Sequence, residues 1–426
     1  MAQNHVKTFA AGTRRSLVGA CAAALLWAHP AQAEERVGTP IMPEHIEELP
    51  RNAEPSASLF SYLKDRTRLA YGFEENYRDN LLAQDNNRQE EFMSTLEGEI
   101  FFSDPRGTLL YGTDYEFNAR RYHHKNVEAL DQDAHAFLDV DPGGRYKYGF
   151  RYDFYLNNSF TFGRESDVDV IQRFAQLRTD VRHSVSGSYR YALNDTNALV
   201  PSVSYKVYEV IRPSSANATD RNTLTAKLDM DHDLSPALVF FGGYEFEDAV
   251  IPSDSRKDSQ AHGIHVGLRH ELSQISSLKS ELSFVRREFN IGKTFSTPDF
   301  LLEWKYLLNP RTTLKFKYTD SNLPSYDSNL LEFRSSSFDG EAAYDLTPLI
   351  RTSFGGSYDR TKSTADSLLP GAPSTLTTAS DRYGLRAAVE WDIIEKLHVS
   401  IYYRYSRATT ADYTENNVTI QIEKEL

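Results

Sequence analysis

RYKYGFRYDFYL, residues 145–156, is the stretch of sequence that decides the fold class. Its even-numbered positions hold Tyr, Tyr, Phe, Tyr, Phe and Leu, and its odd-numbered positions hold Arg, Lys, Gly, Arg, Asp and Tyr. Because successive side chains of a β-strand point to opposite faces, this alternation predicts a strand with one aromatic face and one charged face. The aromatic face must meet either the core of a soluble sandwich or the lipid of a membrane.

The N-terminus has the parts of a secretory signal peptide. Two arginines precede an apolar run at residues 17–27, and the small-residue motif AQA follows at residues 31–33. We therefore expect residues 1–33 to be removed on export. A lipoprotein box at residues 18–21 and a twin-arginine signal at residues 14–15 are alternative interpretations of the same leader.

Composition excludes several classes of protein. Cys21 is the only cysteine, so the exported chain has no disulfide, no cysteine zinc site and no thiol nucleophile. Without the three basic residues of the leader, the chain has 44 basic and 60 acidic residues, a net charge near −16, and no nucleic-acid partner is expected. No apolar run beyond the leader approaches 18 residues, which argues against a transmembrane helix.

Residues 34–65 differ in composition from the rest of the chain. Four prolines and six glutamates in this segment predict an extended, acidic periplasmic linker. The alternation of the opening stretch then recurs from residue 66 to residue 426, and we assign all of this region to one all-β domain.

The alternation predicts about 18 strands, within a range of 16–18. Their apolar faces lie at residues 67–73, 92–102, 111–119, 134–140, 146–156, 181–191, 203–207, 224–230, 238–246, 264–268, 278–284, 302–308, 314–318, 338–346, 350–358, 383–391, 399–405 and 418–422.

The connectors between these strands fall into two alternating classes. One class is short, with turn sequences such as LSP at residues 234–236 and LTP at residues 346–348. The other class is long and polar, at residues 157–172, 213–222, 252–260, 320–329 and 361–380. This alternation is typical of a transmembrane antiparallel β-barrel with short periplasmic turns and long outer loops. A periplasmic sandwich or a solenoid is the alternative.

The C-terminal segment is consistent with an outer-membrane barrel. Residues 418–426 form an amphipathic strand that resembles the signal read by the barrel-assembly machinery, although Lys424 interrupts its apolar row and Leu426 stands where phenylalanine is usual. A closed barrel is also the form of sheet that lipid tolerates, because an open edge would leave backbone groups unpaired. We therefore expect the outer-membrane lipid and the assembly machinery as partners.

If the aromatic faces meet lipid, the charged faces line a lumen. The basic residues that we assign to the lumen are Arg145, Lys147, Arg151, Arg178, Arg182, Arg190, Arg351, Arg386 and Arg404. These side chains form either a basic ladder that guides an anionic polymer or a set of structural ion pairs with the acidic residues of the same faces.

Signals of catalysis are weak in this sequence. No G-x-S-x-G motif occurs, and the best histidine groups are His123-His124 and the pair His262 and His265. On a strand, His262 and His265 fall on opposite faces, which argues against joint metal binding. We expect no enzyme activity, no cofactor and no metal.

Two hairpin sequences carry a family resemblance. YDLTPLIRTSFGGSYDR at residues 344–360 and WDIIEKLHVSIYYRYSR at residues 391–407 resemble the outer-membrane β-barrel porin 2 family. The resemblance implies a passive conduit for a secreted exopolysaccharide, working beside periplasmic export components. The alternatives are a general small-solute porin, a barrel enzyme, and an adhesive or structural barrel.

Overall fold

The computed structural model describes residues 66–79, 90–161, 173–212, 220–273, 275–324, 331–363, 368, 379–394, 396–409 and 413–426. The predicted signal peptide at residues 1–33 and the predicted linker at residues 34–65 lie outside the described residues.

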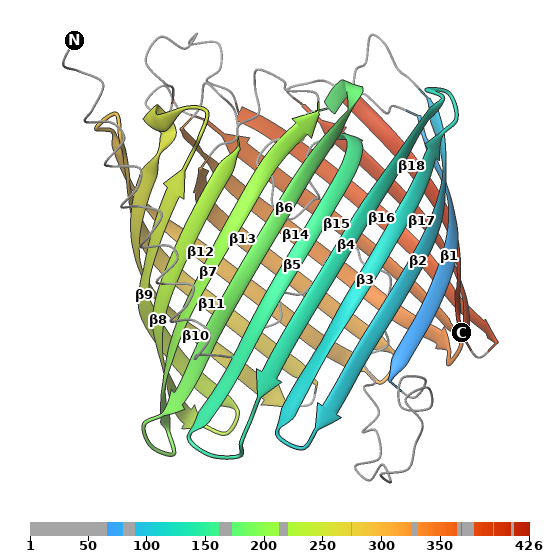
Figure 1. The fold of residues 1–426 in the computed structure, drawn as a ribbon. Coiled ribbons are helices and arrows are strands. Elements are labelled where there is room, and N and C mark those ends of the chain that lie inside the picture. The colour runs from blue at the N-terminus through green and yellow to red at the C-terminus, as the bar shows by residue number, and fades with distance from the viewer. Residues whose placement is uncertain are drawn as a thin grey trace, which may run out of the picture.

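The described chain is a succession of β-strands (Figure 1). The strands are β1 (Thr67–Arg78), β2 (Glu91–Arg106), β3 (Leu109–Tyr122), β4 (Val127–Val140), β5 (Tyr146–Thr161), β6 (Arg173–Ala192), β7 (Asn197–Arg212), β8 (Arg221–Ser235), β9 (Leu238–Val250), β10 (Ser259–Ser273), β11 (Ser276–Phe289), β12 (Thr294–Asn309), β13 (Thr312–Pro324), β14 (Glu332–Thr347), β15 (Ile350–Lys362), β16 (Ala379–Ile394), β17 (Leu397–Ala408) and β18 (Tyr413–Glu425). A 3-10 turn, η2 (Ser255–Lys257), lies between β9 and β10.

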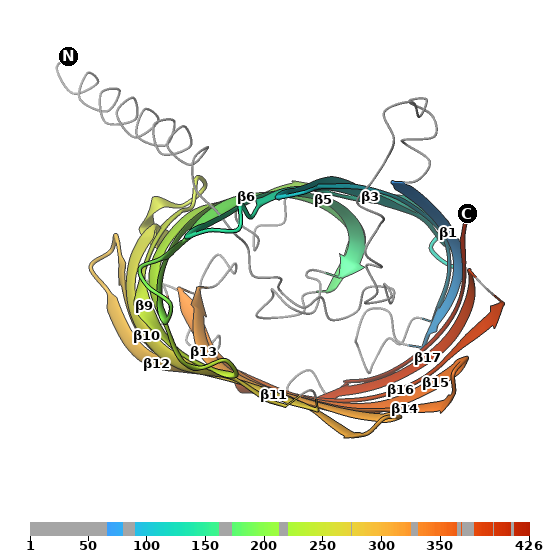
Figure 2. The same cartoon turned by 90° about the horizontal axis from the view of Figure 1, so that it is seen from below.

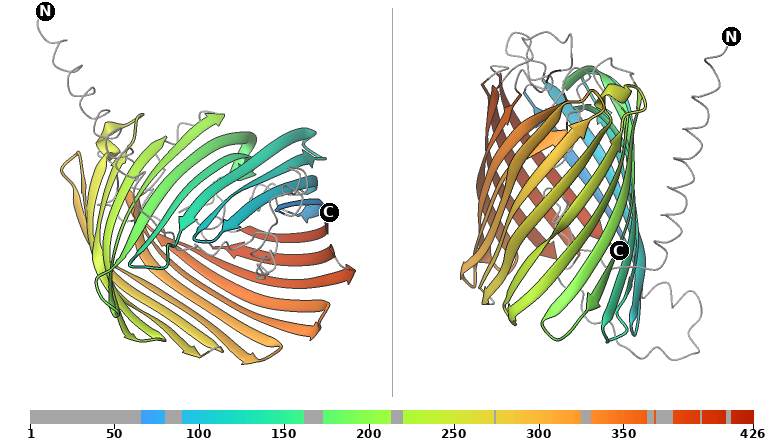
Figure 3. Two further views of the ribbon diagram at one scale, coloured as in Figure 1. Left: turned by 60° about the horizontal axis from the view of Figure 1, so that its bottom comes forward. Right: turned by 90° about the vertical axis from the view of Figure 1, so that its left-hand side faces the viewer.

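These strands form one closed antiparallel barrel. Each strand pairs with its neighbours in sequence, and β1 also pairs with β18, with Phe73 opposite Ile422. Figure 3 shows the closed wall from two sides. Closure satisfies the backbone donors and acceptors that the edges of an open sheet would leave unpaired. The prediction of an all-β barrel with 18 strands is confirmed.

The two ends of the barrel differ as the connectors predicted. The β2–β3 and β4–β5 turns lie at the lower end in Figure 1, and the longer β9–β10 connector, which contains η2, lies at the upper end. One short turn, between β4 and β5, uses Gly143 at φ 71°, a backbone conformation that glycine adopts without a Cβ penalty. The lower end corresponds to the periplasmic side of an outer-membrane barrel.

Exposure alternates along the strands with the predicted period of two. In β10, Ile264 and Val266 are 61% and 49% exposed, whereas Ala261 and His265 are 4% and 8% exposed. The exposed apolar residues lie on the outside of a closed wall, where lipid is the phase that stabilises them. No helix among the described residues is long and apolar enough to cross a membrane.

Several strands run further than the sequence predicted. β5 continues to Thr161 and β13 to Pro324, so the first residues of the connectors predicted at 157–172 and 320–329 belong to strands. The extra pairs are polar: the Thr179 hydroxyl donates to Asn158 Oδ1 at 2.6 Å, and the backbone N–H of Asn158 donates to Asp131 Oδ1 at 2.6 Å. Above the lipid, a paired strand needs no apolar face, so the sequence of these residues shows no alternation and predicts a loop. The upper end of the β5–β6 hairpin bends into the interior of the ring (Figure 2).

Candidate functional site: the lumen wall

The nine basic residues predicted for the lumen do not all lie on strands. Arg145 lies in the turn that precedes β5, because the turn begun at Asp141 extends to this residue, and Arg178 lies in β6 with its side chain outside the described part. The other seven occupy strand positions on the face opposite to the exposed apolar side chains: Lys147, Arg151, Arg182, Arg190, Arg351, Arg386 and Arg404.

Most of these seven side chains have an acidic partner within 4 Å, on the wall or in an adjoining turn. Lys147 Nζ lies 2.6 Å from Asp141 Oδ2 in the neighbouring turn, and Arg351 Nε lies 3.9 Å from Asp345 Oδ1. Arg182 Nε lies 3.6 Å from Asp180, and its guanidinium lies 5.4 Å from the centre of the Tyr208 ring. Arg190 pairs with Asp231, which also accepts a hydrogen bond from Arg269 at 2.7 Å. The arrangement favours structural ion pairs over a ladder of available cations.

Arg386 has the most complete set of partners among these residues. Its two terminal nitrogens donate to the two carboxylate oxygens of Asp339 at 2.6 and 2.7 Å, and Nη2 donates to Glu341 at 3.1 Å. Arg386 lies in β16 and Asp339 in β14, so the side chain must cross β15. It crosses at Gly355, where a Cβ atom would lie 2.7 Å from Arg386 Nε. The absence of a side chain at Gly355 therefore lets a bidentate ion pair lie flat against the wall.

Two other glycines of the described strands have a similar role. His265 of β10 contacts Asp229 of β8 at 3.0 Å, and the pair crosses β9 at Gly243, where a Cβ would collide with Asp229. Gln421 of β18 donates to Glu97 of β2 at 2.8 Å and crosses β1 at Gly72. In each case a glycine in the middle strand lets polar side chains two strands apart meet along the wall.

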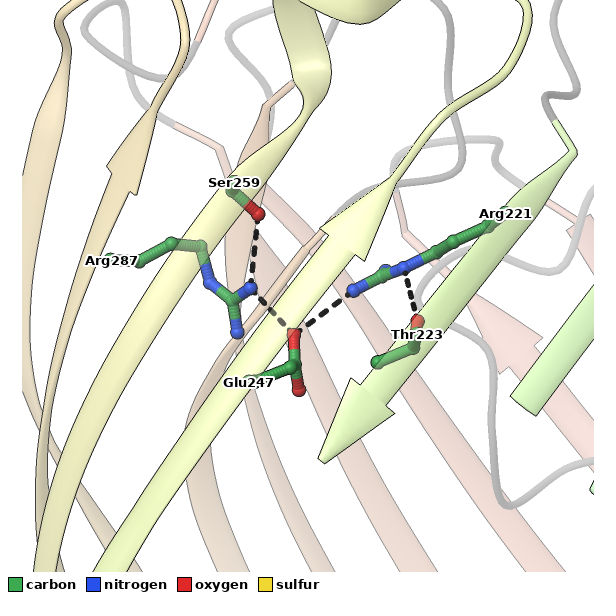
Figure 4. Close-up of polar contacts among 5 residues, drawn as sticks. All are labelled: Arg221, Thr223, Glu247, Ser259 and Arg287. Carbon is green, nitrogen blue, oxygen red and sulfur yellow. Dashed lines mark hydrogen bonds and ion pairs between the residues drawn. The ribbon is translucent and has the colours of Figure 1, made fainter. Parts of the chain in front are cut away.

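A buried ion cluster lies near the upper end of β8–β11 (Figure 4). Glu247 Oε1 accepts from Arg287 at 2.7 Å and from Arg221 at 3.2 Å, and Arg287 also donates to Ser259 Oγ at 3.3 Å. Both arginines are 6% exposed. Because two guanidinium groups converge on one carboxylate and are largely shielded from water, this cluster ties four strands together.

One side of the lumen is acidic. The strands β1–β4 carry lumen-facing carboxylates at Glu74, Glu97, Glu99, Asp114 and Glu116 among others. Glu99 of β2 lies directly opposite Glu116 of β3, a like-charge cross-strand pair that is destabilising by itself. The guanidinium of Arg68 lies 3.7 Å from Glu99, and the Asn118 side-chain amide donates to Glu116 at 2.8 Å.

The other side of the lumen carries lysines. Lys305 of β12 lies directly opposite Lys315 of β13, again a like-charge cross-strand pair, and Lys317 contacts Glu303 at 2.8 Å. In a ring of 18 strands, β12 lies nine places from β3. Figure 2 shows β12 and β3 on opposite sides of the barrel. An acidic wall therefore faces, across the lumen, a wall whose lysines lie beside Glu303 and Glu341, and this register-dependent feature was not predicted from the sequence.

The described histidines form no metal site. No group of three or more His, Cys, Asp or Glu in the described part of the chain is placed to hold a metal ion. His262 contacts the Tyr244 hydroxyl at 2.5 Å on the outer face, whereas His265 contacts Asp229 on the inner face. The prediction that these two histidines point to opposite faces is confirmed.

Comparison with known proteins finds similarity in overall fold alone. No protein-family model and no curated protein matches the chain. Among solved structures, OpdQ of Pseudomonas aeruginosa aligns at 12% identity over 86% of this chain and 99% of that chain, with a TM-score of 0.48. OccK2 (OpdF) of P. aeruginosa, solved in complex with glucuronate, aligns at 11% identity over 85% and 99%, with a TM-score of 0.47. OccAB4 of Acinetobacter baumannii aligns at 8% identity over 85% and 98%, with a TM-score of 0.45.

These values carry no argument about substrate or family, so the resemblance to the β-barrel porin 2 family stays a prediction. The closure of the strands, their apolar outer face and their charged inner face define the chain as an 18-stranded antiparallel β-barrel of the transmembrane type.

Proposed function

We propose that this barrel is a passive, non-enzymatic channel for small polar solutes that prefers cations. The size of the barrel supports a water-filled path. Strands about 4.8 Å apart and tilted by about 40° close, at 18 strands, to a backbone diameter of roughly 35 Å. Barrels of about 16–18 strands leave an aqueous channel after side chains fill the rim of the lumen.

The observation that carries the proposal is the pair of facing walls. The like-charge pairs Glu99–Glu116 and Lys305–Lys315 are each unfavourable by themselves, which favours a role in the lumen over a purely structural role. On the lumen surface, carboxylates of β1–β4 outnumber their basic neighbours. Unscreened carboxylates raise the local concentration of cations and lower that of anions.

Planar-bilayer recording tests this function. The wild-type barrel in a KCl gradient is expected to conduct and to give a reversal potential of the sign that indicates a preference for potassium over chloride. Replacing both Glu99 and Glu116 by Gln is expected to lower the cation-to-anion permeability ratio. The matched change of Lys305 and Lys315 to Gln is expected to raise that ratio. A wild-type barrel that never conducts would refute the channel proposal. Unchanged cation-to-anion permeability ratios in both variants would refute the proposal that the two walls set ion selectivity.

A second candidate is a passive conduit for an exopolysaccharide, with periplasmic export components as partners. Its support is the resemblance carried by residues 344–360 and 391–407. The arginines that would form a basic track, such as Arg386 and Arg190, are paired with carboxylates, which makes an anionic polymer the weaker candidate. Block of the conductance by an anionic polysaccharide, but not by neutral sugars, would favour the polymer conduit.

A further inference from the structure

Basic residues gather on the outer face of β14–β17, near the upper end of the barrel. Arg334 of β14, Arg360 and Lys362 of β15, and Arg407 of β17 occupy the positions that alternate with the lumen face. Below them on β15, the same face carries Tyr358 and the 61% exposed Phe354. The basic residues therefore continue the lipid-facing rows of their strands upward.

The height of these residues follows from the aromatic row beneath them. Tyr358 lies opposite Tyr383 of β16, and their ring centres are 5.1 Å apart. Tyrosines at this end of a membrane barrel mark the boundary between acyl chains and headgroups. Arg360 and Lys362 lie two and four residues further up β15. At about 2.5 Å of height per residue in a tilted strand, they reach the headgroup layer.

The charges of this patch are not balanced. Arg334 donates to both oxygens of Asp320 at 2.8 and 2.5 Å. Asp381 accepts from the Tyr358 hydroxyl at 2.7 Å and lies 3.7 Å from Arg360.

Lys362 and Arg407 are exposed, and no carboxylate of the described residues lies within ion-pair distance of either. Among the described residues, the patch of Arg334, Arg360, Lys362 and Arg407 thus has four cations and two acidic partners.

Other basic residues at the upper rim are paired locally. Arg286 lies 2.6 Å from Glu288 on the outer face of β11, and Arg121 lies 3.9 Å from Glu128 beside the β3–β4 turn. Within the described part of the rim, the surplus of positive charge is a property of β14–β17.

We propose that this patch binds a phosphate-bearing lipid of the outer leaflet. Arginine and lysine bind phosphate oxygens through charge-assisted hydrogen bonds, and Asp381 and Asp320 hold two of the arginines in place. The apolar rows directly below, which include Phe354, Leu385 and Ile401, offer a wall for acyl chains. This continuity of a phosphate-binding rim with an apolar wall selects a lipid over free phosphate.

Lipid retention by the purified barrel tests the site. The barrel in a neutral detergent is titrated with diphosphorylated lipid A, with the same lipid after enzymatic removal of its phosphates, and with inorganic phosphate, and bound lipid is counted by native mass spectrometry. The diphosphorylated lipid is expected to bind at least about tenfold more tightly than the dephosphorylated lipid, the difference that one charge-assisted hydrogen bond supplies. Equal binding of the two lipids, or full competition by inorganic phosphate at the same concentration, would overturn the proposal.

A set of variants locates the site. Changing Arg360, Lys362 and Arg407 together to Gln is expected to remove the preference for the phosphorylated lipid. The matched control changes Arg121 and Arg286 to Gln and is expected to keep it. Retained preference in the first variant, or loss in both, contradicts the assignment to β14–β17. The comparison of the two lipids on the wild-type barrel needs no variant, so the proposal is testable even if the triple variant does not fold, and failure of lipid binding leaves the channel proposal unaffected.

Discussion

Replacement of Gly355 by alanine tests the idea that glycines let ion pairs lie along the wall. The new Cβ would lie 2.7 Å from Arg386 Nε, 3.1 Å from Arg386 Cγ and 2.8 Å from the backbone oxygen of Gly340. Real Cβ atoms avoid such distances, so Arg386 must leave its bidentate contact with Asp339 or the backbone must shift. Overpacking of this kind costs about 1–3 kcal/mol of folding free energy.

The neighbouring glycine is the matched control. A Cβ at Gly356 would meet nothing closer than 3.6 Å, the distance to the Gly384 oxygen and to Leu385 Cδ2. Gly356→Ala is therefore expected to be neutral or to stabilise by roughly 0.5–1 kcal/mol, because alanine loses less backbone freedom on folding than glycine.

Reversible folding into lipid vesicles measures both changes. Tryptophan fluorescence against urea concentration gives the free energy of unfolding of Gly355→Ala, Gly356→Ala and the double variant Gly355→Ala with Arg386→Ala. The double variant is expected to lose less free energy of unfolding than the sum of its two single changes. The reason is that Arg386→Ala removes the side-chain atoms with which the new Cβ would clash. Equal stability of the two glycine variants would refute the account of the wall.

Three further changes test other parts of the structure. Phe150→Arg places a charge on the lipid face of β5 and should cost about 2–4 kcal/mol in the same folding assay, whereas Arg151→Ala should fold like the wild type and change the ion permeability ratio; equal, harmless effects on folding would make the inside–outside assignment wrong. In the β9–β10 connector, a hydrogen bond from Arg256 holds the pKa of Asp254 below its ordinary value. The carboxylate therefore contributes stability above the unfolded pKa near 4 and loses it as the pH falls through the lower folded pKa. Carbon-13 titration of Asp254 should show this depressed pKa and its rise on Arg256→Ala, and an unchanged titration would exclude the contact.

The strands could be predicted from the sequence because the side-chain period of a strand is visible without knowing its neighbours. Tyr146 to Leu156 in β5 and Ile264 to Leu268 in β10 show the alternation directly. Tyr146, Ile264 and Val266 are exposed as expected, whereas the other lipid-facing residues of β5 are half-buried. The polar upper ends, such as Asn158 in β5, were missed because strands above the lipid no longer need an apolar face. Arg145 was misplaced because a turn with two glycines gives no signal of where it ends.

The partners of the lumen charges could not be predicted, because alternation gives the face of a residue and not its register. Arg386 meets Asp339 two strands away, and the contact depends on Gly355 lying between them. The facing of Glu99 and Lys305 depends in addition on closure of the ring after 18 strands. A glycine at a mid-strand lumen position is a sequence signal that could have pointed to such contacts.

Cysteine accessibility in a conducting barrel tests the central claim most directly, because the predicted exported chain has no cysteine of its own. Glu99→Cys places a thiol on the lumen face of β2, and Ile100→Cys places one on the lipid face at the next residue. A water-soluble cationic methanethiosulfonate reagent should change the conductance of Glu99→Cys and make the channel less cation-selective, and it should leave Ile100→Cys unchanged. A response at Ile100→Cys with none at Glu99→Cys would contradict the inside–outside assignment, and the absence of any conductance would contradict the channel.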